Sequence, residues 1–94
     1  MSDKQEHKHY RITIAPSAIK TLGTLENALR TRIQKRIEEL ADTPRHRQSK
    51  KLKGEDNLYR NRVGVYRIVY TIQDDKLIVL VLAIGHRREI YDRD

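Results

Sequence analysis

The sequence predicts one α+β domain in the order β-α-α-β-β-β, with a twisted, mainly antiparallel sheet of about four strands and a helical hairpin on one face. Three observations predict this class. Apolar residues recur every three to four positions between residues 25 and 41, which is typical of an amphipathic helix. Three segments between residues 58 and 84 have the composition of strands and are separated by turn residues. A chain of 94 residues has room for one domain with one or two layers of secondary structure.

The first element is a strand. Residues 9–15 alternate between apolar and polar side chains, as a half-buried strand does. Pro16 ends this strand and suits the first turn of a short helix. An apolar stripe follows on that helix, formed by Ala18, Ile19 and Leu22. Gly23 is expected to stop it.

The second helix has the clearest pattern in the chain. Thr24 is its expected N-cap, and Glu26 lies in the first turn, where a carboxylate is favourable. Proline disfavours helical geometry at the residue before it, so Asp42-Thr43-Pro44 is expected to end the helix. The apolar side of the helix, which runs as far as Ala41, consists of Leu25, Leu29, Ile33, Ile37 and Leu40. The two helices together can cover one face of a sheet.

The rest of the chain supplies the sheet. Residues 45–57 are polar and basic, with only Leu52 to anchor them, and are expected to form a loop. Gly64 marks one tight turn, and Gln73-Asp74-Asp75 supplies another. The last strand is apolar on both faces, so we expect it to be central and covered on both sides. The three strands are predicted at residues 58–63, 65–72 and 77–84.

Positive charge is concentrated in one part of the chain. The formal net charge is +7, and residues 44–72 alone carry eight basic and two acidic side chains. Such a patch is the electrostatic footprint of a nucleic-acid binder, although a solvated basic loop would have the same composition. Cysteine is absent, and the four histidines lack metal-ligand spacing, so we expect no disulfide, no metal and no cofactor.

Nothing in the sequence indicates a membrane or export. The longest apolar run, residues 77–84, is far shorter than the ~20 residues of a membrane span. Residues 1–8 lack the apolar stretch of a secretion signal and are expected to be a flexible tail. We therefore expect residues 1–94 to form a single cytoplasmic domain.

The side chains suited to chemistry are cationic, and we expect them to meet on the sheet face that no helix covers. Arg60 and Arg62 alternate and so share one face of their strand, and Arg67 is expected to point the same way. Arginine forks match phosphate oxygens in two-point contacts. Beyond the last strand come His86, Arg87, Arg88 and Tyr91.

Such a cluster could cut RNA without a metal. The 2′-hydroxyl attacks the adjacent phosphate while a base takes its proton, cations hold the added negative charge and an acid protonates the leaving 5′-oxygen. A tyrosine among cations could be the base, because they lower its pKa. Each residue also has a structural interpretation: Tyr66 and Tyr70 as core or rim aromatics, Arg62 as a salt-bridge partner of Glu55 or Asp56 and His86 as a polar strand end.

Three motifs resemble the RelE branch of the RelE/ParE toxin superfamily. They are a K-L-x-G loop, a G-x-Y-R-[IV]-[IV]-Y strand and a G-H-R-x-x-[IV]-Y ending, at residues 51–54, 64–70 and 85–91. The resemblance extends from the first strand to Tyr91. It implies a compact sheet with a helical hairpin and a type II toxin that cleaves mRNA in the ribosomal A site, leaving a 2′,3′-cyclic phosphate and a 5′-hydroxyl.

The resemblance also implies roles for single residues. Tyr91 takes the place of the general base, Arg87 that of the arginine that helps protonate or stabilise the leaving group, and Arg67 that of the arginine that grips the scissile phosphate. The remaining basic residues of the central segment are expected to bind RNA or the ribosome: Lys50, Lys51, Lys53, Arg45 and Arg47.

Three positions depart from the family's pattern. Arg60 and Arg62 stand where the best-studied members have lysines, and arginine keeps the charge but does not readily exchange a proton. These two are therefore expected to act by electrostatics alone. His86 also replaces a lysine and, with an ordinary pKa near 6.5, could share the role of acid with Arg87.

A toxin needs a partner that restrains it. The basic segment calls for an acidic antitoxin, and the exposed hairpin and sheet suit a chain with an amphipathic helix that folds as it wraps. Two other functions are kept as alternatives. One is a ParE-like toxin that poisons DNA gyrase, although that branch generally lacks the terminal tyrosine and the full cationic set. The other is a basic nucleic-acid-binding module without catalysis.

Overall fold

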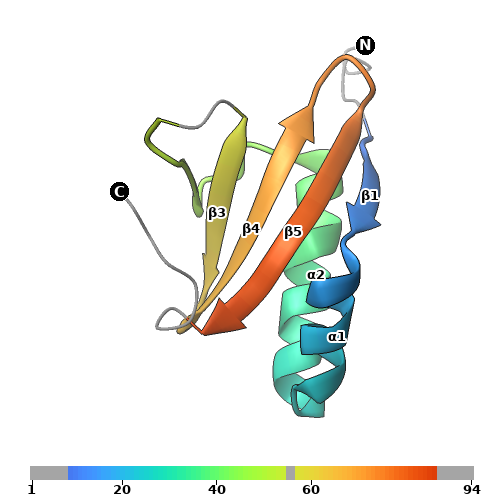
Figure 1. Cartoon of the computed structure of the whole chain (residues 1–94), viewed down its shortest axis with the longest axis vertical. Helices are drawn as coiled ribbons and strands as arrows, with labels where there is room; N and C mark the ends of the chain where they lie inside the picture. The colour runs from blue at the N-terminus through green and yellow to red at the C-terminus, as the bar shows by residue number, and fades with distance from the viewer. Residues whose placement is uncertain (1–8, 55–56, 87–94) are drawn as a thin grey trace, which may run out of the picture.

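A computed structural model, which describes residues 9–54 and 57–86, shows one sheet with two helices packed on one of its faces (Figure 1). The strand order is β1-β5-β4-β3-β2, with β1 parallel to β5 and every other neighbouring pair antiparallel. The α+β class is as predicted. The elements are β1 (Arg11–Ile14), α1 (Pro16–Thr24), α2 (Asn27–Asp42), β2 (Ser49–Lys51), β3 (Leu58–Val63), β4 (Tyr66–Gln73) and β5 (Ile78–His86).

The sheet has five strands instead of about four, because β2 forms inside the segment expected to be a loop. This strand has only three residues, Ser49–Lys51, and it pairs with β3 at the edge of the sheet. Its sequence shows no apolar alternation, since an edge strand with polar side chains buries neither face. The anchor predicted for this segment, Leu52, is confirmed as a buried residue.

The helical hairpin is confirmed, but its joint differs from the prediction. Gly23 does not stop α1, which continues to Thr24. Thr24 does not cap α2: its Oγ1 donates to the carbonyl of Thr21 (2.7 Å) in the last turn of α1, and Glu26 occupies the N-cap position of α2. Ile19 also leaves the predicted stripe and is 56% exposed, whereas Ala18 and Leu22, four positions apart, share the buried side.

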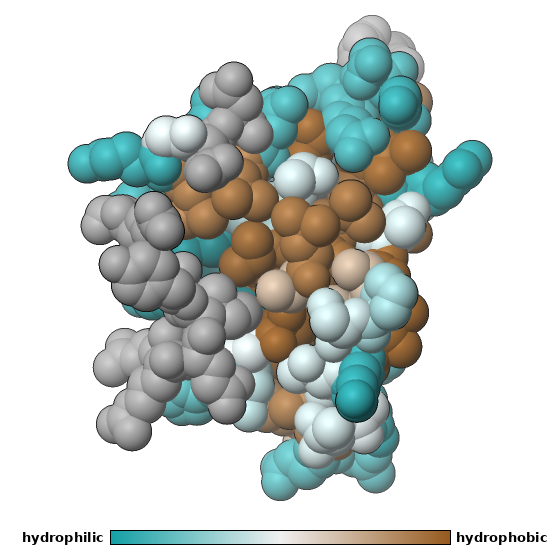
Figure 2. Space-filling view, viewed as in Figure 1, coloured by the Kyte–Doolittle hydropathy of each residue, from teal (hydrophilic) through white to brown (hydrophobic). Residues whose placement is uncertain are grey.

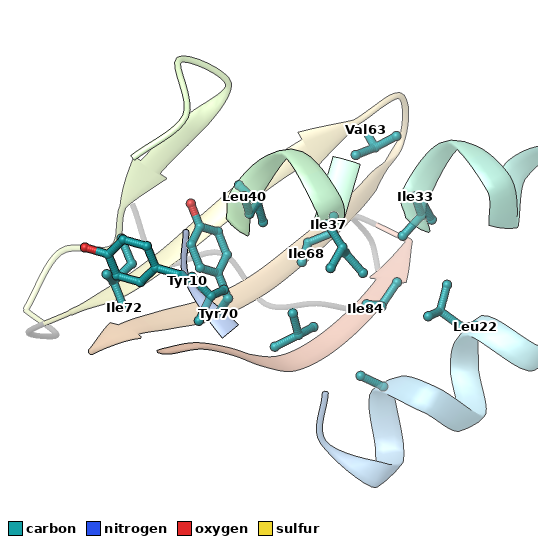
Figure 3. Packing of buried hydrophobic residues seen from close by; sticks show 13 residues of the cluster. Tyr10, Leu22, Ile33, Ile37, Leu40, Val63, Ile68, Tyr70, Ile72 and Ile84 are labelled. Atoms are coloured by element: carbon teal, nitrogen blue, oxygen red, sulfur yellow. The ribbon is translucent and has the colours of Figure 1, made fainter. Parts of the chain in front are cut away.

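The core lies between the helices and one face of the sheet. In Figure 3, Ile37 and Leu40 of α2 point toward Ile68 and Tyr70 of β4. The predicted end of α2 is confirmed, since the helix finishes at Asp42. The buried cluster consists of Tyr10, Ala18, Leu22, Ile33, Ile37, Leu40, Val63, Ile68, Tyr70, Ile72, Val79, Val81 and Ile84.

Within residues 9–54 and 57–86, no helix lies over the opposite face of the sheet. As predicted, β5 is an inner strand, but both described helices lie on its core side, so no described helix covers its other side. Val79 and Val81 are fully buried, whereas Ile78 and Leu80, which alternate with them, are only partly buried. Figure 2 shows the resulting apolar area in the middle of this face. We call it the open face.

A two-residue turn joins β3 to β4. Gly64 has φ +61°, and Val63 pairs with Tyr66 directly across the turn. A glycine at the first turn position is what a type II′ hairpin requires. Gly64→Ala is therefore expected to lower the free energy of unfolding by about 1–2 kcal/mol, measured by urea denaturation.

Gly23 provides the matched control. It lies in α1 without a positive φ, and a Cβ placed there would meet nothing within 4 Å. Gly23→Ala should stabilise the protein by roughly 0.5–1 kcal/mol, because alanine loses less backbone entropy in a helix. Equal effects of the two substitutions would contradict the assignment of the turn.

Candidate phosphate-binding site

Strands β3 and β4 place three arginines on the open face. Arg62 lies directly opposite Arg67, and Arg60 lies opposite Val69. Between them, Asn61 and Val63 face the core and are buried. Side chains alternate between the two faces along a strand, so Arg60, Arg62 and Arg67 emerge on the same side.

Two of these arginines are unusually enclosed. Arg60 is 8% exposed and Arg67 7% exposed, whereas Arg62 is solvent-exposed. Like charges directly opposite each other on neighbouring strands destabilise a sheet, and Arg62 and Arg67 are such a pair. An anion bound between them would turn this repulsion into attraction. Two arginines placed in this way could contact the same anion.

The edge strand adds further cations. Lys50 of β2 lies opposite Arg60, and Arg47 precedes the strand. An open cleft of about 280 Å³ is lined by Arg47, Gln48, Ser49, Lys50, Arg60 and Arg62. Four of these six residues are cationic and none is acidic. We call it the cationic cleft; its charge and openness suit the phosphates of a polymer.

The residues predicted to bind RNA lie in different parts of the structure. Lys51 lies opposite Tyr59, so the register places it on the other face from Lys50. Lys53 is exposed in the turn after β2 and is not among the residues lining the cationic cleft. Only Lys50 of the three lysines joins Arg47 in the cleft.

Arg45 is held in a polar cluster beside the turn between β4 and β5. Its Nη2 donates to Asp74 Oδ2 (2.9 Å) and its Nε to the hydroxyl of Tyr59 (3.2 Å). Asp74 Oδ1 also accepts a hydrogen bond from the hydroxyl of Tyr10 (2.6 Å), which raises the pKa of Tyr10 above its ordinary value. The cluster ties the segment after α2 to the β4–β5 turn. Local sequence patterns carry no sign of it, because its members are far apart in the chain.

His86 was expected to lie with Arg67, but it has a different neighbour. It pairs with Tyr66 at the end of β5, and the two rings meet edge to face with centroids 5.6 Å apart. Arg67 pairs with Gly85 instead. The register thus places His86 on the face of Tyr66 and not on that of Arg67. Arg87 and Tyr91 lie outside the described residues.

No three His, Cys, Asp or Glu side chains gather as potential metal ligands within residues 9–54 and 57–86. In the same ranges, neither helix is long and apolar enough to span a membrane.

The fold and the cleft together define a class of protein: a small α+β domain with a helical hairpin on one side of its sheet and a cationic cleft on the other. A family model described as "ParE toxin of type II toxin-antitoxin system, parDE" matches residues 9–91. The chain belongs to the RelE/ParE superfamily of type II toxins, and its relatives place it in the RelE branch.

Two curated relatives are from Escherichia coli. The chain is 31% identical over 80 residues to a putative RelE-like toxin protein, with 83% of each chain covered. It is 29% identical over 86 residues to the mRNA interferase toxin RelE of strain K12, covering 87% of this chain and 90% of that protein.

Solved structures of the same fold include two toxin–antitoxin complexes. The archaeal RelE–RelB complex from Pyrococcus horikoshii OT3 gives a TM-score of 0.77 at 28% identity, covering 87% of this chain and 99% of that one. The intact RelBE complex of E. coli gives 0.73 at 28% identity, covering 82% and 95%.

Proposed function

We propose that this toxin is an endoribonuclease that cuts messenger RNA on the ribosome, in the cytoplasm and without a metal ion. The observation that carries the proposal is the pairing of Arg62 with Arg67 beside the cationic cleft. Cations held in place before the reaction stabilise the negative charge that builds up on a phosphate under attack. The E. coli K12 relative carries the name mRNA interferase.

At phosphorus, the reaction forms one bond and breaks one. The 2′-oxygen bonds to phosphorus, the bond from phosphorus to the 5′-oxygen breaks, and the products carry a 2′,3′-cyclic phosphate and a 5′-hydroxyl. We assign Tyr91 to remove the proton from the 2′-hydroxyl, Arg87 to assist the leaving oxygen and Arg67 to hold the phosphate. His86 is the second choice as acid; it lies on the face of Tyr66, so the end of β5 would have to rearrange to bring its ring to the arginine face.

The arginines of β3 have an electrostatic role in this scheme. Arg60 and Arg62 keep their protons throughout, so they stabilise the transition state and favour the phenolate of Tyr91 without exchanging a proton. The enclosure of Arg60 strengthens its field, because few water molecules screen it.

The chemistry of the RNA ends tests the proposal. Purified toxin is incubated with translating ribosomes, and the new 5′ ends are mapped and their termini identified. New ends with a 5′-hydroxyl next to a cyclic phosphate are expected, and prior treatment of the toxin with EDTA should not change the rate. Ends with a 5′-phosphate would indicate attack by water and would overturn the 2′-hydroxyl mechanism. Inhibition of DNA gyrase without RNA cleavage would favour the ParE-like alternative, and RNA binding with no new ends would favour the non-catalytic module.

The charges of the cationic cleft are expected to determine how RNA binding depends on salt. Replacing Arg47 and Lys50 with glutamine should weaken ribosome and RNA binding and reduce the slope of log K against log salt by about 0.7 for each phosphate that the cleft no longer neutralises. Lys51→Gln is the matched control for Lys50→Gln alone, because each removes one charge from the same strand but on opposite faces. A slope that falls equally in these two single variants would show that only net charge matters and not the cleft.

We further propose that an acidic antitoxin restrains this toxin. Complexes with RelB are the subject of the P. horikoshii and E. coli structures. The open face combines partly buried apolar side chains, such as Leu80, with a cationic side, which suits an acidic chain with an amphipathic helix. Co-expression with the adjacent small open reading frame should relieve growth arrest and give a complex that co-purifies. A basic partner would count against this proposal.

A further inference from the structure

A line of hydrogen bonds crosses the protein behind the cationic cleft. Arg36 of α2 donates through Nη1 to Asn61 Oδ1 and to the carbonyl of Arg62 (2.8 Å). The amide of Asn61 then donates through Nδ2 to Ser49 Oγ (2.7 Å). Ser49 Oγ also lies 2.6 Å from the hydroxyl of Tyr70, which lies 2.6 Å from the carbonyl of Pro44.

The direction of the last two bonds follows from counting protons. Tyr70 has one hydroxyl proton and two neighbouring acceptors, so it can donate to only one of them at a time. The carbonyl of Pro44 can only accept, so Tyr70 donates to it, and Ser49 can then donate its own proton to Tyr70. Burial raises the pKa of Tyr70 to about 12, so its hydroxyl keeps its proton at neutral pH. The line then runs in one direction from Arg36 to Pro44.

Two members of this line are deep inside the protein. Asn61 and Tyr70 are both fully buried, at 0% exposure. A buried polar group that loses its partner costs about 1–3 kcal/mol, so the line constrains every residue in it. It joins α2, β3, β2 and β4 to the segment that leads from α2 into β2.

The strand β2 depends on this line more than the other strands do. It is three residues long and lies at the edge of the sheet. Its other two side chains, Lys50 and Lys51, are exposed and bury little apolar surface. Ser49 is therefore the residue of β2 whose side chain is bonded into the interior.

We propose that Ser49 is a positioning residue: bonded to Asn61 and Tyr70, it holds β2 so that Arg47 and Lys50 stand across the cationic cleft from Arg60 and Arg62. That an RNA phosphate is the ligand of the cleft rests on the proposed function. The placement of the cations does not rest on it, because that placement follows from the register and the hydrogen bonds.

The test compares Ser49→Ala with Ser49→Thr, which keeps a hydroxyl and suits a strand. Inorganic pyrophosphate is titrated into each protein and followed by the amide NMR signals of β2 and β3. Ser49→Ala should bind about three- to tenfold more weakly, because the paired state of β2 is less populated. Hydrogen exchange of the β2 amides should accelerate by a similar factor. Ser49→Thr should recover most of both effects.

Kinetics on ribosomes separate positioning from general loss of structure. Ser49→Ala should raise KM by the same factor as the pyrophosphate Kd and leave kcat nearly unchanged, as expected when uniform binding is lost. In a background that already lacks the charges of Arg47 and Lys50, the same substitution should add little further loss. Ile33→Val is the stability control, since Ile33 lies in the core away from the line of hydrogen bonds and its truncation should not alter Kd.

Three results would overturn the proposal: unchanged pyrophosphate binding in Ser49→Ala, additive losses in the combined variant, or an equal loss in Ile33→Val. A wild-type protein that binds pyrophosphate in a Ser49-dependent way but cuts no mRNA would refute the proposed nuclease and leave the positioning role intact. The two proposals can thus fail separately.

Discussion

Replacing Arg67 with methionine is expected to lower mRNA cleavage on the ribosome about 10²–10³-fold, the loss typical of removing a preorganised group that stabilises transition-state charge. Arg67 lies in β4, which has β3 on one side and β5 on the other, and its side chain is 7% exposed. A charge held this firmly needs little rearrangement when the phosphate becomes more negative. Methionine keeps the length of the side chain and removes the charge.

The stability of the same variant provides the control. Methionine keeps the packing of this buried side chain, so the free energy of unfolding is not expected to fall in proportion to the activity. Arg67→Lys should be intermediate in activity, because lysine keeps the charge without the two-point fork. Full activity of the methionine variant would exclude Arg67 from the reaction. Activity lost only in step with unfolding would assign it a structural role.

Tyr91→Phe is expected to lower cleavage about 10²–10⁴-fold, as for the loss of a general base, with ribosome binding nearly unchanged. Tyr91 lies outside the described residues, and its role rests on the family resemblance. A general base must be deprotonated to act, so the wild-type rate should rise with pH until this tyrosine is ionised and then level off. The phenylalanine variant should lose that rise.

Tyr66→Phe is the matched control for the loss of a phenolic hydroxyl. Tyr66 lies in β4 with its ring against His86, on the face away from Arg67. Its variant should cleave mRNA at close to the wild-type rate. If Tyr91→Phe stays as active and as toxic as the parent protein, Tyr91 is not the base.

The sequence alone was sufficient for the fold class and most of its elements. The 3.6-residue period of α2 and the turn residues around β3, β4 and β5 are local patterns that burial imposes directly on the chain. The shared face of Arg60 and Arg62 also follows from local alternation. The prediction was wrong where one side chain suited two positions. Thr24 could have capped α2 or ended α1, and in the structure it ends α1.

The sequence could not predict β2 or the open side of β5. An edge strand of three polar residues exists because β3 offers unpaired backbone groups beside it, and those are specified elsewhere in the chain. The apolar run of β5 indicated two covered faces, but both helices within the described residues lie on the core side.

What the sequence by itself determined about this protein is its class, its charge and the residue types available for chemistry. Tertiary structure decided which of the cations meet. Arg47 and Lys50 join the cleft, Arg45 bonds to Asp74 and His86 turns to Tyr66. The physical reason is strand register: shifting a pairing by one residue sends each side chain to the opposite face. Register is specified by contacts between distant segments, such as the bonds that join Ser49 to Asn61 and Tyr70.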